Sequence, residues 1–154
     1  MDKTTFLATL DAERFQWDAS LAQIPATRML EPGLVGEWSV KDLLAHIVWC
    51  EREIVGLLRS RSLQEASAWW NLPQEERNAA IFAAHRSRPL DDVVTEARLI
   101  HAQLRALLDQ LTDEDWIDPQ RYAGMPQDWT PWHIIAQNTY EHYQHHLPAL
   151  QAWR

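Results

Sequence analysis

The sequence predicts an all-α fold, a four-helix bundle formed by a single domain over residues 1–154. Apolar side chains recur at every third or fourth position in four long segments, which is typical of helices that bury one face. Proline-bearing loops separate these segments, and no segment alternates apolar and polar residues as a half-buried strand does. A chain of 154 residues suits one domain with one hydrophobic core.

The first helix is predicted from about Lys3 to Ile24, and Pro25 ends it. A loop over residues 25–38 follows. Because the apolar side chains of this helix share one face, we expect them to lie in the core of the bundle. They are Phe6, Leu10, Trp17, Leu21 and Ile24.

The second helix is predicted to begin at Ser39, since serine is a good N-cap and Asp42 occupies the third helical position of a near-relative of the capping box. It is expected to end near Ser62. Pro73, followed by glutamine and two glutamates, indicates the start of a short helix that ends before Pro89.

The third long helix is predicted from about Leu90 to Leu111, with Asp91 and Asp92 in the first turn, where the helix dipole favours negative charge. A loop over residues 112–130 follows. Long connections are thus expected after the first and the third long helices, and the bundle need not have up-down-up-down connectivity.

The last long helix is predicted from Pro131 to about Leu147. Thr130 is a suitable N-cap, and proline is favoured at the first helical position. Pro148 is expected to end or kink this helix, because proline lacks the backbone N–H.

The net charge of −8 argues against binding to nucleic acid, because phosphate contacts need clustered lysine and arginine. The 14 basic residues are scattered, and no nucleic-acid partner is expected. No apolar run approaches the roughly 20 residues of a membrane span, so no membrane partner is expected. The first residues do not resemble a signal peptide, and a cytoplasmic location is expected.

Cys50 is the only cysteine, and one thiol cannot build a disulfide framework or a cysteine-based zinc site. A metal ion in this protein is therefore expected to be held by histidine, aspartate or glutamate. Only four glycines are present, and none forms a phosphate-binding motif.

His142 and His146 lie four residues apart in the last predicted helix, so both imidazoles project on one flank of its core face. Such a pair is a common way for one helix to offer two ligands to one metal ion. A half-buried surface pair has the same spacing.

His46 lies at the edge of the apolar stripe of the second helix. A lone histidine there can be a hydrogen-bonded core residue, but bundles also build metal sites from side chains on facing helices. Spacing alone does not decide whether His46 meets the histidine pair. No role is expected for His85, His101, His133 and His145.

Glu51 stands in the middle of the same apolar stripe, between Ile47 and Ile54. A buried carboxylate needs a partner or takes up a proton. Glu51 is expected to pair with Arg14 of the first helix, and it is also a candidate general base near a metal ion.

Two blocks of sequence resemble the DinB-like metalloenzyme superfamily. One is Trp38–His46 (WSVKDLLAH), and the other is Asn138–Pro148 (NTYEHYQHHLP); residues 78–90 also resemble the ClbS/DfsB-type branch. The resemblance implies a four-helix bundle of the DinB/YfiT-like type. It also implies a divalent ion, zinc or nickel, bound by His46, His142 and His146, with a coordination position left for water.

The same resemblance implies a homodimer and chemistry on a small-molecule substrate. Thiol-dependent relatives continue after the second histidine of the pair with Arg-Gly-Gln, whereas this chain has Leu147-Pro148-Ala149, which favours the ClbS/DfsB-type branch over a thiol cosubstrate. Members of that branch open the strained ring of a genotoxin. The expected function is metal-dependent hydrolysis of, or thiol transfer to, a small electrophile in stress or detoxification.

Two alternatives stay open at this point. The chain could bind or sequester a small molecule without catalysis, its histidines being structural. It could instead be a dimeric stress protein, because Phe15 and Trp49 lie away from the main apolar stripes of their helices and could mark an interface.

Overall fold

The computed structural model describes residues 1–153 and confirms the four-helix bundle. No β-strand forms among these residues, in which only two isolated bridges occur. None of the helices in this part of the chain is long and apolar enough to cross a membrane. The bundle consists of α1 (Lys3–Ala22), α2 (Val40–Ser60), α4 (Leu90–Gln110) and the consecutive pair α6 (Pro131–Gln137) and α7 (Tyr140–Ala152).

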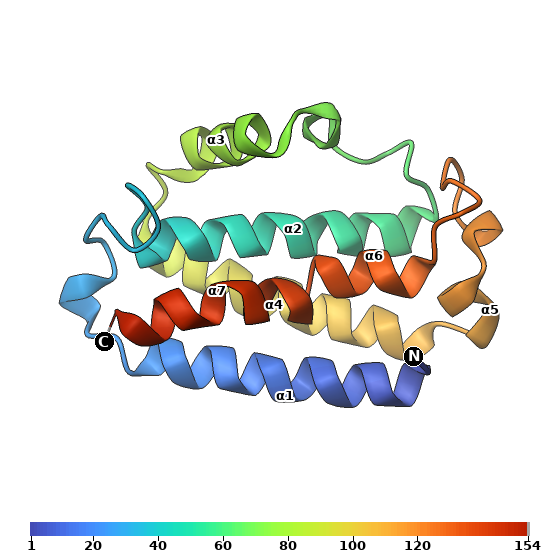
Figure 1. Cartoon of the computed structure of the whole chain (residues 1–154), viewed down its shortest axis with the longest axis horizontal. Helices are drawn as coiled ribbons and strands as arrows, with labels where there is room; N and C mark the ends of the chain where they lie inside the picture. The colour runs from blue at the N-terminus through green and yellow to red at the C-terminus, as the bar shows by residue number, and fades with distance from the viewer. Residues whose placement is uncertain (154) are drawn as a thin grey trace.

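Helices α2 and α4 run in the same direction, opposite to α1 and to the α6–α7 pair (Figure 1). This arrangement arises because α3 (Gln74–His85) returns the chain along the outside of α2. The segment between α4 and α6 contains a short helix, α5 (Asp113–Ile117), where an irregular loop was predicted. A capping box between Thr112 and Asp115 starts it.

The predicted capping box fixes the start of α2. Ser39 Oγ accepts a hydrogen bond from the Asp42 backbone N–H at 3.2 Å, and the Asp42 carboxylate accepts one from the Ser39 backbone N–H at 2.9 Å. α2 ends at Ser60, and the C-cap residue Arg61 adopts the left-handed conformation with a φ of 54°. The helix is therefore anchored at its N-terminus about two turns before His46.

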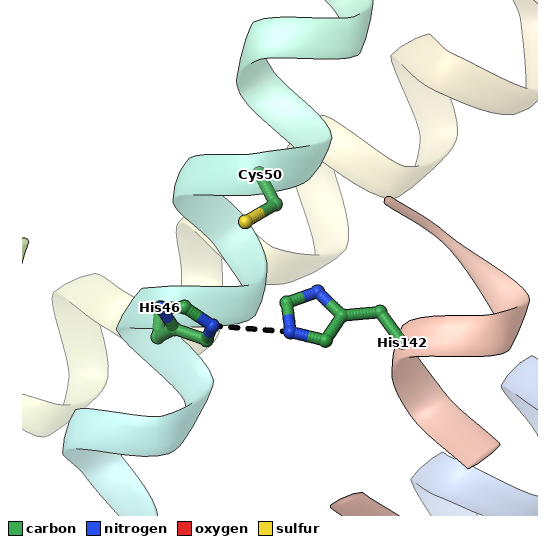
Figure 2. Close-up of side chains that lie close together, drawn as sticks. All are labelled: His46, Cys50 and His142. Atoms are coloured by element: carbon green, nitrogen blue, oxygen red, sulfur yellow. Dashed lines mark hydrogen bonds between the residues drawn. The ribbon is translucent and has the colours of Figure 1, made fainter. Parts of the chain in front are cut away.

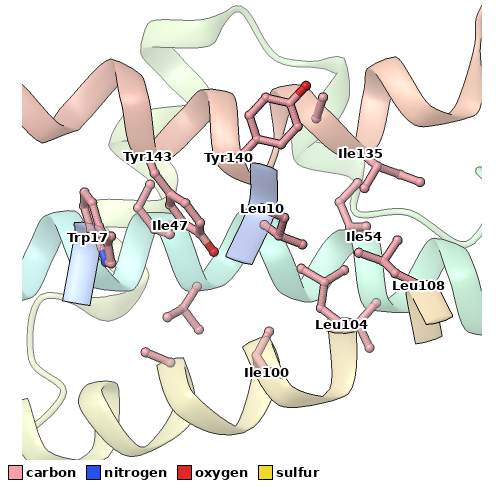
Figure 3. Close-up of a cluster of buried hydrophobic side chains, with 14 of the residues drawn as sticks. Leu10, Trp17, Ile47, Ile54, Ile100, Leu104, Leu108, Ile135, Tyr140 and Tyr143 are labelled. Carbon is pink, nitrogen blue, oxygen red and sulfur yellow. The ribbon is translucent and has the colours of Figure 1, made fainter. Parts of the chain in front are cut away.

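The core contains side chains from all four long segments (Figure 3). Trp17 of α1 and Tyr143 of α7 are fully buried and stack with ring centroids 5.6 Å apart. Since stacked aromatic pairs add stabilisation beyond their burial, this contact helps to hold α7 against α1.

The last predicted helix is divided at Asn138 and Thr139, and Pro148 does not end it. The Asn138 Nδ2 donates to the carbonyl of Ile134 at 2.9 Å, and Thr139 Oγ1 donates to that of Ile135 at 2.7 Å. These side chains occupy carbonyls near the end of α6, and Thr139 leaves helical geometry with φ −130° and ψ −106°. Pro148 lies inside α7.

α3 and the 3₁₀ turn before it cover one side of α2. Trp49 is only 4% exposed, because Trp69, Trp70 and Ile81 pack over it and Cys50. The interface expected from Trp49 is therefore not formed, since this side chain is covered by its own chain. Phe15, the other member of the expected interface, is exposed.

Glu51 is completely buried and lies in a polar network that involves four helices. Its carboxylate accepts a hydrogen bond from Tyr143 and has Arg14 Nη1 and His101 Nδ1 at 3.7 Å each. Arg14 also bonds to Asp18 on α1. The network joins α1, α2, α4 and α7, and the expected pairing of Glu51 with Arg14 is present.

We predict that Arg14→Met destabilises the protein by about 3–5 kcal/mol, because it leaves the buried Glu51 carboxylate without its cation. Urea denaturation measures this free energy. Arg105→Met is the matched control: its ion pair with the exposed Asp11 lies at the surface, and its loss should cost no more than about 1 kcal/mol. Equal effects of the two changes would contradict the role of the network.

Candidate metal centre

Two pairs of side chains, each with a spacing of four residues, face one another across the contact between α2 and α7. His46 and Cys50 lie on successive turns of α2, and His142 and His146 lie on successive turns of α7. Figure 2 shows His46 and Cys50 side by side, with His142 pointing toward them from α7. The tertiary structure thus brings the three predicted histidines into one cluster.

The spacing of His46 and His142 fits a single ion, and the ring of His146 lies beside both. His46 Nε2 and His142 Nε2 are 3.0 Å apart, and two nitrogens bound to one tetrahedral zinc ion would be separated by roughly 3.3 Å. The ring centroids of His46 and His142 lie 4.8 Å apart, and His146 lies 4.9 Å from His142 and 5.8 Å from His46. Imidazoles around one tetrahedral ion would have centroids roughly 5 Å apart.

Cys50 belongs to the same cluster, although it was not among the predicted site residues. Ligand atoms of His46, Cys50 and His142 all lie within 4.8 Å of one another. The expectation that only histidine, aspartate or glutamate would hold an ion left out a mixed set, in which one thiol joins histidines. The four-residue spacing of His46 and Cys50 on one helix was visible in the sequence.

Burial keeps the three imidazoles neutral, which is the form that binds metal. Burial and the nearby His146 lower the pKa of His46 to about 4, and burial with His46 and His146 lowers the pKa of His142 to about 2. Burial, together with His145, lowers the pKa of His146 to about 4. The pKa of the Cys50 thiol rises to about 12 because of its burial.

Two buried nitrogens of the cluster have no hydrogen-bond partner within residues 1–153, namely Nδ1 of His46 and Nδ1 of His142. Buried polar atoms in proteins are nearly always paired. Within the described part of the chain, the two Nε2 atoms bond only to each other, so the rings are not held by a saturated network of hydrogen bonds to the rest of the protein. This donor set of imidazoles and one thiol fits a divalent ion of the zinc or nickel type.

A cavity of about 890 Å³ opens beside the cluster and includes all four of these side chains in its lining. Trp38 forms part of its wall. Its ring centroid lies 5.2 Å from that of His46, and the ring stacks on Phe82 of α3. Trp70 and Arg77 form another part, with the guanidinium 4.9 Å above the indole. The volume lies in the range of small-molecule pockets.

Trp38 and Trp70 are the tryptophans that line the cavity. The 3₁₀ turn Ala68–Asn71 brings Trp70 to the site and α3 brings Arg77, and the packing of this segment on α2 could not be deduced from periodicity. His145, to which no role was assigned, also lines the cavity.

Glu51, the candidate general base, does not line the cavity. Its carboxylate instead bonds to Tyr143, the residue after His142. His101 takes part in the same network, and the exposed His133 on α6 lies outside the cluster.

Comparisons with known proteins agree with the fold. Residues 9–148 match the model of the DinB superfamily, and no match was found among curated protein sequences. An uncharacterised protein from Escherichia coli UTI89 superposes with a TM-score of 0.78 at 17% identity, covering 98% of this chain and 91% of that one.

Two further solved structures belong to the branch that the sequence resembles. The colibactin self-resistance protein ClbS, in complex with double-stranded DNA, has a TM-score of 0.80 at 14% identity, covering 97% of this chain and 93% of its own. DfsB, described as a sibling lethal factor precursor, has a TM-score of 0.79 at 15% identity, covering 99% and 95%. The predicted resemblance to ClbS and DfsB is confirmed at the level of the fold.

The DNA in the ClbS structure overturns one expectation. The net charge led to the expectation of no nucleic-acid partner, and that expectation was wrong, since a protein with this fold has been solved in complex with double-stranded DNA. Net charge is a sum over the whole surface, whereas phosphate binding depends on the local arrangement of cations.

We predict that the metal-free protein loses stability on acidification. His46 has a pKa of about 4 when folded and an ordinary value of 6.5 when unfolded, so only the unfolded state gains this proton between those pH values. Its contribution is present above pH 6.5 and is lost as the pH falls toward 4, by about 3 kcal/mol.

Urea denaturation at pH 7 and pH 4 in the presence of a chelator measures this loss. It should shrink in His46→Gln and stay unchanged in His133→Gln, which alters an exposed histidine. The same loss in His46→Gln as in the wild type would rule out this origin.

Proposed function

The chain belongs to the DinB superfamily, and on that premise we propose that it is a divalent-metal-dependent enzyme acting on a small electrophile. The observation that carries this proposal is the convergence of His46, His142 and His146 on one wall of the 890 Å³ cavity. Neutral imidazoles beside a cavity of this size are what a catalytic metal site with room for a substrate requires.

The three histidines would hold zinc or nickel, both of which accept imidazole ligands. A bound ion of this kind supplies Lewis acidity and lowers the pKa of a water molecule that it binds. His142 and His146 are fixed by α7, and His46 by α2, so the contact between these helices sets the position of the ion.

The cavity supplies contacts for a substrate of mixed character. Trp38 and Trp70 offer apolar faces, while Arg77, Asn138 and Glu141 offer charge and hydrogen bonds. An electrophile that stacks on the indoles would present its polar group to the histidine wall. Apolar walls with a few convergent polar groups are typical of small-molecule sites.

Glu51 acts in this proposal as a positioning residue. The hydrogen bond that Glu51 accepts from Tyr143 holds α7 in place next to His142. Glu51 does not contact the substrate and would affect the reaction only through the position of α7. Hydrolysis by water is the simplest reaction at such a site. Transfer of a thiol to the same electrophile would place the thiol cosubstrate in the same cavity.

We predict that the purified protein binds about one equivalent of Zn²⁺ or Ni²⁺ and that His46→Ala and His142→Ala each abolish tight binding. Calorimetric titration with elemental analysis measures the stoichiometry. His133→Ala, in the exposed part of α6, is the matched control and should bind as the wild type does. Wild-type protein that takes up neither ion would refute the metal site and favour a binding protein with structural histidines.

A second candidate function is binding to double-stranded DNA, as in ClbS. The observation that favours it is a pair of arginine–aromatic contacts associated with α3, which lies outside the bundle (Figure 1). Arg77 lies over Trp70 at 4.9 Å, and Arg86 lies over Phe82 at 5.4 Å. Guanidinium groups held in this way can contact phosphates at a known position.

We predict that a short fluorescent DNA duplex binds at low salt and that Arg77→Ala with Arg86→Ala weakens binding on all sequences alike. The slope of log affinity against log salt should fall by roughly 1 for each arginine removed. Arg98→Ala on α4 changes an exposed arginine elsewhere and is the control. An anisotropy that stays flat with the wild-type protein at low salt would eliminate this candidate.

A further inference from the structure

We propose that Cys50 is a direct ligand of the metal ion, which the chain would then hold with two facing pairs, His46 and Cys50 on α2 and His142 and His146 on α7. This inference rests on the metal site of the proposed function and deepens it, because it names a sulfur donor and the class of ion that the site selects.

The geometry places the thiol where a ligand must be. Cys50 follows His46 by four residues, so its Sγ lies one turn along the same face of α2. Its Sγ and the nitrogens of His46 and His142 lie within 4.8 Å of one another. Sulfur and nitrogen bound to one tetrahedral zinc ion would be roughly 3.6 Å apart, so a side-chain shift of about 1 Å closes the set.

An independent observation points to a ligand at this place. His46 is 94% buried, since its exposed fraction is 6%, and its Nδ1 has no hydrogen-bond partner within residues 1–153. The neighbouring Nε2 faces His142 Nε2 at 3.0 Å, which brings two potential metal donors together beside the thiol. In the metal-free protein the two Nε2 atoms share a hydrogen bond with each other, and a cation between the rings would take the place of that shared proton.

Coordination changes the thiol chemically. The ion displaces the proton of Cys50, a metal–sulfur bond forms, and the proton passes to solvent. A thiolate with imidazoles favours zinc, nickel and cobalt over magnesium and manganese, which prefer oxygen ligands.

Four protein donors would fill a tetrahedral ion, so entry of a substrate needs a position to open. His146 is the donor suited to give way, because its ring lies farthest from His46, at 5.8 Å between centroids, and is less buried than His46. The alternative route is a fifth ligand added from the cavity. In both routes His46, Cys50 and His142 remain as the inner part of the site.

Titration of the metal-free full chain with Co²⁺ tests this inference, with a phosphine in place of thiol reductants. We expect an intense near-ultraviolet band from sulfur-to-cobalt charge transfer that saturates at one equivalent. Because Cys50 is the only cysteine, a thiolate band in the wild type identifies it without any variant. This readout does not depend on activity or on whether a variant folds.

Cys50→Ser is the matched variant, since it keeps the size of the side chain and replaces sulfur with oxygen. We expect it to lose the near-ultraviolet band and retain the visible bands of bound cobalt. Its Zn²⁺ affinity should fall by at least about 10-fold, the lower end of what loss of an outer-shell partner already costs. His146→Ala should keep the charge-transfer band, because the sulfur ligand remains.

Two other outcomes are decisive. Binding of one equivalent of Co²⁺ without a charge-transfer band would overturn the role of Cys50 and leave the histidine site of the proposed function intact. No binding of Co²⁺, Zn²⁺ or Ni²⁺ at all would overturn both.

Discussion

The seating of α7 on α1 and α2 is the constraint on which the rest of the structure depends. Tyr143 stacks on Trp17 and donates a hydrogen bond to Glu51, so one side chain ties α7 to both neighbouring helices. His142 precedes Tyr143 directly and points toward α2 rather than into the core (Figure 2). Core packing and the position of the candidate ligands are therefore set by the same turn of helix.

The break in the last helix at Thr139 lets α6 and α7 pack independently, one in the core and the other beside the candidate ligands. α6 fills the core with Ile135 and Ala136, and α7 begins anew with the turn that carries His142. In the 131–147 helix predicted from sequence, the orientation of the histidines would follow from the phase of α6. The break gives α7 its own phase, which the contacts of Tyr143 then determine.

The outer layer formed by α3 turns a helix face into a cavity. Without it, His46 and Cys50 would lie on an open flank of α2, where water would surround them. Trp70, in the 3₁₀ turn before α3, and Arg77, in α3, line one side of the cavity. Trp38, which precedes α2, lines another. Burial holds the pKa values of the histidines well below 6.5, and this lowers the stability of the folded state at acidic pH, where the unfolded chain binds protons that the folded protein does not. That same burial keeps them ready as neutral ligands.

The sequence by itself determined the long helices, most of their ends and the three histidines of the candidate site. Periodicity, the capping box at Ser39 and the proline after Thr130 are local properties, and local hydrogen bonding decides them. Only the tertiary structure decided that His46 contacts His142, that Cys50 lies beside them and that α3 covers one side of the cavity. Those facts depend on the direction and relative position of helices far apart in the chain, which the packing of the whole core sets and no local pattern encodes.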